Sequence, residues 1–356
     1  MLPEEDSHSS GKVLTSIQKE FAIHGDGSLR NSYGQCFFVW KVVDFQRWWL
    51  SFEAHAGIPL GRKLMNAATD EEEYQLDQCS LLVTGWFMKK RRIHSALFNR
   101  WQNMGWGQYV MNSDTVFSYL LAPVVSGFAL AANEGATFQR KKIQWRQISN
   151  VQIQLETNDD VRSISLAPSP PQFPWDSNAS ARAIQRSVEL DFQLVEYGWT
   201  SSGERSFFLP SGLFQRLFKS VQMQGLVLRP DILDKWEFKG ISGPETTTPL
   251  ILAALAVDEM ISLSERPIYI QDLGSWEQLV NAYLKPFGYG SFINSSSLDE
   301  QGGVEFLLQP SPILPFTIGF LVAFWQRGIG RKARVCIDIG DETCVCQITS
   351  FLSYSS

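Results

Sequence analysis

The chain lacks several features that would identify a common class of protein at once. Five cysteines in 356 residues are too few for the disulfide framework of a small secreted domain, which predicts a reducing compartment. The polar and acidic start, Met1 to Ser10, has none of the basic-then-apolar order of a signal peptide, so we predict a cytoplasmic protein. No convincing apolar run reaches the roughly 20 residues that cross a bilayer, so peripheral association is the remaining form of membrane contact.

Clustered positive charge and catalytic motifs are also lacking. The formal net charge is −6, whereas nucleic-acid binding needs Lys and Arg gathered against phosphates, so we predict no nucleic-acid partner. We expect the basic run Lys89 to Arg92 and the acidic run Asp70 to Glu73 to be solvated helix faces. No histidine stands in a recognisable relation to a nucleophile, and no glycine-rich stretch carries the Lys and Ser or Thr of a phosphate loop. The sequence therefore gives no support for an enzymatic activity.

Apolar and aromatic residues are plentiful. They make up 44% and 13% of the chain, enough for two ordinary hydrophobic cores. The stretch from Pro315 to Thr349 is the most informative. It reads as an apolar helix that ends at Gly328 and Gly330, followed by alternating apolar and polar residues on either side of Gly340 and Asp341. This pattern predicts a helix that leads into a β-hairpin.

An earlier part of the chain resembles this stretch and the residues before it. Pro123 to Ala131 parallels Pro315 to Ala323, and each contains a Gly-Phe pair. Further parallels occur in the same order: Gly105 to Val110 with Gly288 to Ile293, Gly57 to Ala68 with Gly243 to Ala254, Phe45 to Arg47 with Phe214 to Arg216, and Phe37 and Phe38 with Phe207 and Phe208. Each match is weak alone, but their shared order predicts two copies of one domain, residues 13–157 and 186–352.

The predicted order of elements in each copy is strands, three helices, strands, helix, strands. With hairpin-length connections between strands, this order predicts an α+β domain with helices packed on one face of an antiparallel sheet. We expect the two copies to form a pseudo-dimer. We expect residues 1–12 to be a disordered tail and residues 158–185, rich in proline and serine, to be a linker.

The order of elements and the spacing Cys336-x3-Gly340-Asp341-x2-Cys344 resemble the 4-vinyl reductase-type domain. That fold is shared with the sensory domains of phenol-responsive transcriptional activators and with TRAPP transport-particle subunits. The resemblance covers most of the second copy and, more faintly, the first. It implies a pocket between helices and sheet for an aromatic or acyl compound.

The phenol-sensing relatives also hold a structural zinc through cysteines and one glutamate. Here the position of the acidic ligand is Ala333, and no cysteine lies between Cys79 and Cys336. A four-ligand site therefore cannot be assembled from this motif alone. Cys336 and Cys344 remain candidates for an incomplete zinc site, and we favour small buried thiols as the alternative.

Six residues are candidates for a ligand pocket, although each is also explained by core packing or by contact between the copies. They are Trp101, Phe128, Trp236, Phe320, Leu321 and Phe324. The main hypothesis is a non-catalytic binding protein for a hydrophobic small molecule of aromatic, acyl or tetrapyrrole type. The alternatives are a scaffold that contacts other proteins, and an accessory protein or reductase of tetrapyrrole metabolism.

Overall fold

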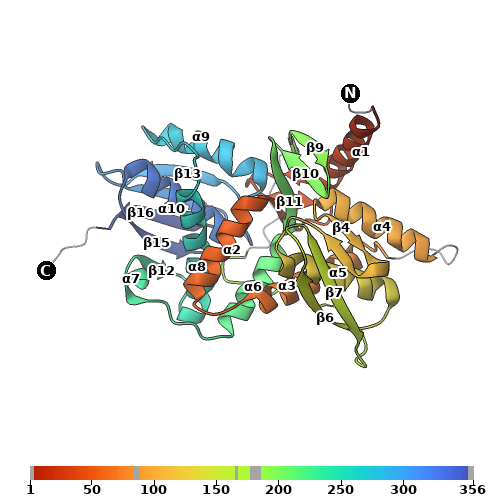
Figure 1. The fold of residues 1–356 in the computed structure, drawn as a ribbon. Coiled ribbons are helices and arrows are strands. Elements are labelled where there is room, and N and C mark those ends of the chain that lie inside the picture. Colours follow the sequence, from red (N-terminus) through yellow and green to blue (C-terminus); the bar gives the residue numbers. More distant parts are fainter. Residues whose placement is uncertain (1–3, 83–88, 165–166, 177–185, 352–356) are drawn as a thin grey trace.

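The computed structural model describes residues 4–82, 89–164, 167–176 and 186–351 (Figure 1). It shows an α+β fold in which helices lie against largely antiparallel sheets. We refer to residues 4–164 as the first half and to residues 186–351 as the second half. No helix among the described residues is both long and apolar enough to span a membrane.

The first half contains these elements in chain order: α1 (Glu4–Glu20), β1 (Phe21–Ile23), β2 (Leu29–Asn31), β3 (Cys36–Lys41), α2 (Val42–Ala56), α3 (Gly61–Gln78), α4 (Lys89–Met104), β4 (Gln108–Val110), η1 (Met111–Ser113), β5 (Thr115–Phe117), α5 (Ala122–Thr137), β6 (Lys141–Gln147) and β7 (Gln152–Asp159). The second half contains β8 (Arg186–Ser187), β9 (Phe192–Val195), β10 (Gly198–Ser201), β11 (Glu204–Pro210), α6 (Ser211–Gln222), α7 (Pro230–Leu233), β12 (Trp236–Lys239), α8 (Pro244–Ser262), α9 (Leu273–Tyr283), η2 (Lys285–Phe287), β13 (Phe292–Ser297), β14 (Val304–Leu308), α10 (Leu314–Ile329), β15 (Ala333–Ile339) and β16 (Cys344–Ser350).

A central seven-stranded sheet joins the two halves. Its order is β8-β1-β2-β3-β11-β10-β9, so the main joint is the antiparallel pairing of β3 with β11, and the short strand β8 of the second half also pairs with β1 of the first. Val39 lies opposite Phe208 at the middle of this pairing. Because the backbone hydrogen bonds of a continuous sheet cross from one half to the other, the halves share one structural unit.

Each half also has a sheet of its own. The first half has the order β4-β5-β7-β6, and the second half has β12-β15-β16-β14-β13. The described strand pairs are antiparallel apart from β12 with β15, which is parallel. The expected antiparallel sheet is therefore mixed at one edge of the second half.

Helices cross from one half to the other. In α2 the aromatic residues Phe45, Trp48 and Phe52 recur at helical spacing and are buried. The helix packs against α8 of the second half, where the indole Nε1 of Trp48 donates to the carbonyl of Ala253 at 3.3 Å. In turn, α6 of the second half packs against α3 of the first (Figure 1).

Two close helix pairs complete the packing. Helix α5 lies on α3, and α10 lies on α8. A Cβ added to Gly127 would lie 2.5 Å from the carbonyl oxygen of Met65, and one added to Gly319 would lie 2.8 Å from Cβ of Val257. Glycine at these two positions therefore allows the helix backbones to approach one another.

The hydrophobic core is continuous across the halves. The ring of Phe214 lies 5.3 Å from that of Trp48 and 4.8 Å from that of Phe316, centroid to centroid. These rings are almost completely buried and come from α6, α2 and α10. Most of the aromatic side chains at the centre of the molecule therefore pack against one another in the hydrophobic core.

The expected disordered tail needs correction, and part of the linker is packed. Residues 4–12 belong to helix α1, where we expected a disordered tail. The linker packs in part against the core: Phe173 and Trp175 are buried and their rings stack at 4.6 Å. Residues 177–185 lie outside the described part of the chain.

Candidate functional site

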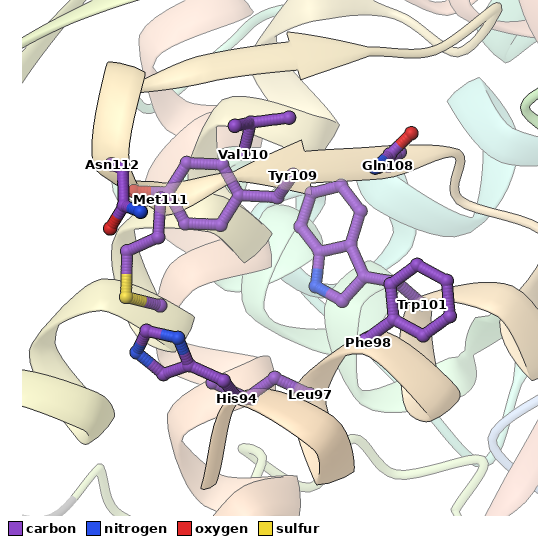
Figure 2. Close-up of a pocket in the computed structure, with 9 residues that line it drawn as sticks. All are labelled: His94, Leu97, Phe98, Trp101, Gln108, Tyr109, Val110, Met111 and Asn112. Carbon is purple, nitrogen blue, oxygen red and sulfur yellow. The ribbon is translucent and has the colours of Figure 1, made fainter. Parts of the chain in front are cut away.

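A half-open pocket of about 210 Å³ lies between helix α4 and the segment formed by β4 and η1 (Figure 2). The described residues that line it come from one stretch of the chain: His94, Leu97, Phe98, Trp101, Gln108, Tyr109, Val110, Met111 and Asn112. The chain can turn back beside α4 because Gly105 and Gly107 adopt φ angles of 73° and 100°, which favour glycine.

The inner wall of this pocket is apolar. Leu97 and Trp101 are four residues apart, so they lie on one face of α4, and they are 4% and 2% exposed. The ring of Tyr109 lies 5.8 Å from that of Trp101, centroid to centroid. His94 and Phe98 are exposed at the rim. The pocket therefore has an aromatic interior and an opening to solvent.

Hydrogen bonds hold Tyr109 in place. Its hydroxyl donates to Oδ1 of Asp114 at 3.0 Å and accepts from Nδ2 of Asn133 at 2.8 Å. Asp114 also accepts from the hydroxyl of Thr157 at 2.7 Å. Burial raises the pKa of Tyr109 well above its usual value, so the side chain stays a neutral phenol. The aromatic wall is thus fixed before any ligand binds.

Trp101 contributes a free polar group. Its Nε1 is buried and makes no hydrogen bond within the described residues. Figure 2 shows this nitrogen on the ring edge that faces Tyr109, Met111 and His94. A buried donor without a partner costs about 1–3 kcal/mol, so an acceptor on a ligand would recover this free energy.

An ion pair fixes helix α4 in position. Nε and Nη2 of Arg100 each donate to Glu72 at 2.7 Å, and both side chains are buried. Glu71, the preceding residue, pairs with Arg216 of α6 at 3.0 Å. The expectation of a solvated acidic face at Asp70 to Glu73 is therefore wrong for Glu71 and Glu72. Arginines distant in the sequence allow these carboxylates to be buried.

The six predicted ligand residues do not meet in one place. Trp101 lines the pocket. Phe128 stacks on Trp106 at 3.9 Å in the core, and Trp236 stacks on Phe238 at the edge of the second-half sheet. Phe320, Leu321 and Phe324 are completely buried. The cavity that Phe320 lines measures about 10 Å³, which is too small for an organic ligand.

Cys336 and Cys344 are also separated. Across the β15 and β16 pairing, Cys336 lies opposite Gln347, whereas Cys344 lies opposite Ile339. Residues that oppose one another share a face and neighbours alternate, so the two thiols lie on opposite faces of the sheet. They cannot share a metal ion, and no group of three or more metal-ligating side chains occurs among the described residues. Burial raises the pKa of Cys344 to about 12, as expected of an apolar thiol in the core.

A second apolar pocket, of about 250 Å³, lies between the ends of α3 and α5. Its lining includes Leu82 and Ile164, which directly precede residues outside the described part of the chain. We therefore base the candidate site on the first pocket, where no described lining residue directly adjoins such a segment.

Sequence reasoning identified Trp101 but missed most of its neighbours. The available signal was the short distance along the chain: the apolar face of α4 ends at Met104, and the glycine turn brings Tyr109 and Met111 back beside it. The orientation of the Trp101 nitrogen had no signal in the sequence.

Comparison with protein-family models, with curated proteins and with solved structures finds no match for this chain.

Proposed function

We propose that the chain is an intramolecular pseudo-dimer of two copies of one α+β domain. The strand order β4-β5-β7-β6 of the first half has the same sequence of elements as β13-β14-β16-β15 of the second. In the chain, α5 lies between β5 and β6, and α10 lies between β14 and β15. Each of these two helices packs on an earlier helix of its own half, with a glycine at the contact. These parallels support a duplication that produced both halves.

The pairing of the central strands also supports the pseudo-dimer. Nε1 of Trp106 donates to the carbonyl of Phe208 at 2.8 Å, and the hydroxyl of Tyr289 donates to the carbonyl of Val39 at 3.3 Å. Val39 and Phe208 are themselves opposite one another. Trp106 and Tyr289 occupy matching positions in the two Gly-x-Gly turns, and each donates to a carbonyl of the central strand of the other half, which supports an approximate twofold relation.

Co-expression of two fragments tests this arrangement. Residues 1–185 and 186–356, produced as separate chains, should form a 1:1 complex because each packs a helix on the other and their strands complete one central sheet. Two stable monomers that do not associate would show that the halves are independent domains.

The function that the site supports best is non-catalytic binding of a small aromatic compound, and the half-open pocket at Trp101 carries this proposal. An apolar cavity of about 150 Å³ is large enough for benzene, so about 210 Å³ fits one ring with a small substituent. A tetrapyrrole has four linked rings and exceeds this volume. The pocket therefore narrows the ligand to a single-ring aromatic compound and gives no support to the reductase alternative.

Titration with phenol and toluene, followed by ligand-observed NMR, tests the proposal. We expect dissociation constants roughly between 10 µM and 1 mM, because a ligand of seven heavy atoms offers few contacts. Leu97→Trp should abolish binding by filling the pocket. Trp101→Phe should weaken phenol roughly 2–12-fold through the lost hydrogen bond and leave toluene less affected.

Leu273→Trp is the matched control, since it adds an indole at an exposed position on α9. It should bind both compounds as the wild type does. If neither compound binds at millimolar concentration, or if Leu97→Trp binds normally, the pocket is not a ligand site.

The scaffold alternative is favoured by one further observation. In the second half β12 pairs with the outer edge of β15, whereas the matching strand β6 has no strand on its outer edge among the described residues. Lys142 and Arg146 are exposed on β6. An extended acidic segment from another protein could add there as a strand.

A peptide of alternating valine and glutamate is a suitable probe, with fluorescence anisotropy as the readout. Binding should be lost in the Lys142→Glu, Arg146→Glu double variant and kept in Arg91→Glu, an exposed charge reversal on α4. Absence of binding to the wild type would reject this alternative.

A further inference from the structure

A separate cavity of about 340 Å³ lies where the two halves meet, between α3 and the first turn of α6. This volume falls at the lower end of the range that holds small ligands, roughly 300–1,000 Å³. Its lining comes from α3, α6, the β2 to β3 turn and two proline-containing segments: Arg30, Gly34, Gln35, Cys36, Glu71, Tyr74, Gln75, Pro170, Ser211, Gly212, Gln215 and Pro312. None of these residues lines the pocket at Trp101.

Gln75 lines this cavity and carries an unused acceptor. The residue is 1% exposed, and its Nε2 donates to Oε1 of Glu71 at 2.8 Å. Its Oε1 is buried and has no hydrogen-bond partner among the described residues. A buried amide oxygen without a donor costs about 1–3 kcal/mol, so a ligand that brings a donor would be stabilised here.

Where Glu71 is ionised, the charges around the cavity are balanced. Nε of Arg216 donates to Glu71 at 3.0 Å, and Nη2 of Arg30 donates to Asp26 at 2.8 Å. A ligand with a net charge would have no free counter-ion in the lining and would lose its hydration. An uncharged ligand with several hydroxyl groups avoids this penalty and supplies donors.

The second half has apolar residues where the first has polar ones. In the alignment of Gly57 to Ala68 with Gly243 to Ala254, continued without a gap, Glu71 and Gln75 correspond to Val257 and Ile261, both buried. This comparison rests on the proposed duplication; the geometry of the cavity does not. Because Val257 and Ile261 fill the matching positions of α8 with apolar side chains, helix packing alone does not require Glu71 and Gln75 to be polar.

From these observations we propose that the cavity between α3 and α6 is a second binding site, for a small uncharged polyhydroxylated molecule such as a polyol or a monosaccharide. Gln75 accepts a hydroxyl proton through Oε1. Ser211, which lines the cavity from α6, offers a second hydroxyl contact.

Saturation-transfer difference NMR on the full chain tests this site, with glycerol, myo-inositol and glucose as probes. At least one should receive saturation from the protein. Gln75→Leu should reduce its affinity at least tenfold, and Ser211→Ala about 2–10-fold. Thermal unfolding checks that Gln75→Leu is folded, because the variant loses the hydrogen bond to Glu71 together with the unpaired oxygen. Leu97→Trp should bind the polyol as the wild type does, which separates this site from the aromatic pocket.

Glucosamine and glucuronate test the charge argument, since they resemble glucose but carry opposite charges. Both should bind more weakly than glucose. The proposal is overturned if no polyol binds at millimolar concentration, if Gln75→Leu and Ser211→Ala both bind as the wild type does, or if a charged sugar binds more tightly than glucose.

Discussion

Arg100 and Glu72 form a two-point ion pair in the interior, where both side chains are almost completely shielded from solvent. The pair joins α4 to α3 and so holds one wall of the aromatic pocket. A carboxylate taken out of water needs its partner, because the protein interior screens and solvates charge poorly.

Removal of the guanidinium should therefore be strongly destabilising. Arg100→Ala leaves Glu72 buried without a counter-ion, and we expect a loss of about 3–5 kcal/mol in the free energy of unfolding, measured by urea denaturation. Arg91→Ala, on the exposed face of the same helix, is the control and should change stability by less than about 0.5 kcal/mol. Equal effects of the two substitutions would contradict the structural role of the pair.

Glu71 should make stability depend on pH. Burial raises its pKa from 4.5 to about 7, against the opposing effects of Arg216 and Gln75. The folded protein then keeps a proton that the unfolded chain has lost, so the contribution of Glu71 to stability falls as pH rises from about 4.5 to about 7. The Tm of the wild type, relative to that of Glu71→Gln, should decrease between about pH 5.5 and about pH 8.

Glu73 has a raised pKa as well, but it is present in both proteins and cancels in this difference. Glu300→Gln, at an exposed position, provides the control, and its Tm relative to the wild type should stay constant over the same range. A difference between wild type and Glu71→Gln that does not vary with pH would show that Glu71 ionises normally in the folded protein.

The helix contacts at Gly127 and Gly319 should not tolerate a methyl group. Gly127→Ala places Cβ against the backbone of Met65, and Gly319→Ala places it against Val257 and Ala254. Each should cost about 1–3 kcal/mol through a forced separation of the helices. Gly11→Ala in α1 has no atom within 4 Å of its new Cβ and should instead stabilise by up to about 1 kcal/mol. Urea denaturation of the three variants decides the matter, and equal changes would refute the close-packing account.

The closing hairpin should be stable without metal. Because Cys336 and Cys344 face opposite sides of the sheet, treatment with EDTA should leave the Tm unchanged. Cys344→Ser puts a hydroxyl in an apolar core and should cost about 1–3 kcal/mol, whereas Cys336→Ser should change little. Stoichiometric zinc in the purified protein, lost together with thermal stability, would show that the two cysteines do hold a metal.

Much of the secondary structure could be read from the chain. The helical spacing of Phe45, Trp48 and Phe52 is visible in the sequence and belongs to helix α2, which Gly57 ends with a φ angle of 68°. The helix and hairpin after Leu314 are likewise confirmed. Strand β12 was missed because its four residues gain their pairing only from β15, which lies about a hundred residues further along the chain.

The candidate sites were much harder to predict. Trp101, Phe128 and Phe324 are equally aromatic and equally suited to helices, yet only Trp101 borders a pocket. The acidic run at Glu71 and Glu72 has the composition of a solvated face. Whether such a run is buried depends on which cations reach it, and Arg216 comes from a helix of the other half.

Local periodicity and the glycine positions, which are properties of neighbouring residues, determined by themselves elements such as helix α2, helix α10 and the closing hairpin. Tertiary structure alone decided which aromatic rings enclose space, which thiols share a face and which carboxylates lose their water. These outcomes depend on side chains that meet at the pairing of β3 with β11 and at the helix contacts between the halves, α2 with α8 and α6 with α3. There, residues far apart in the chain exclude solvent together.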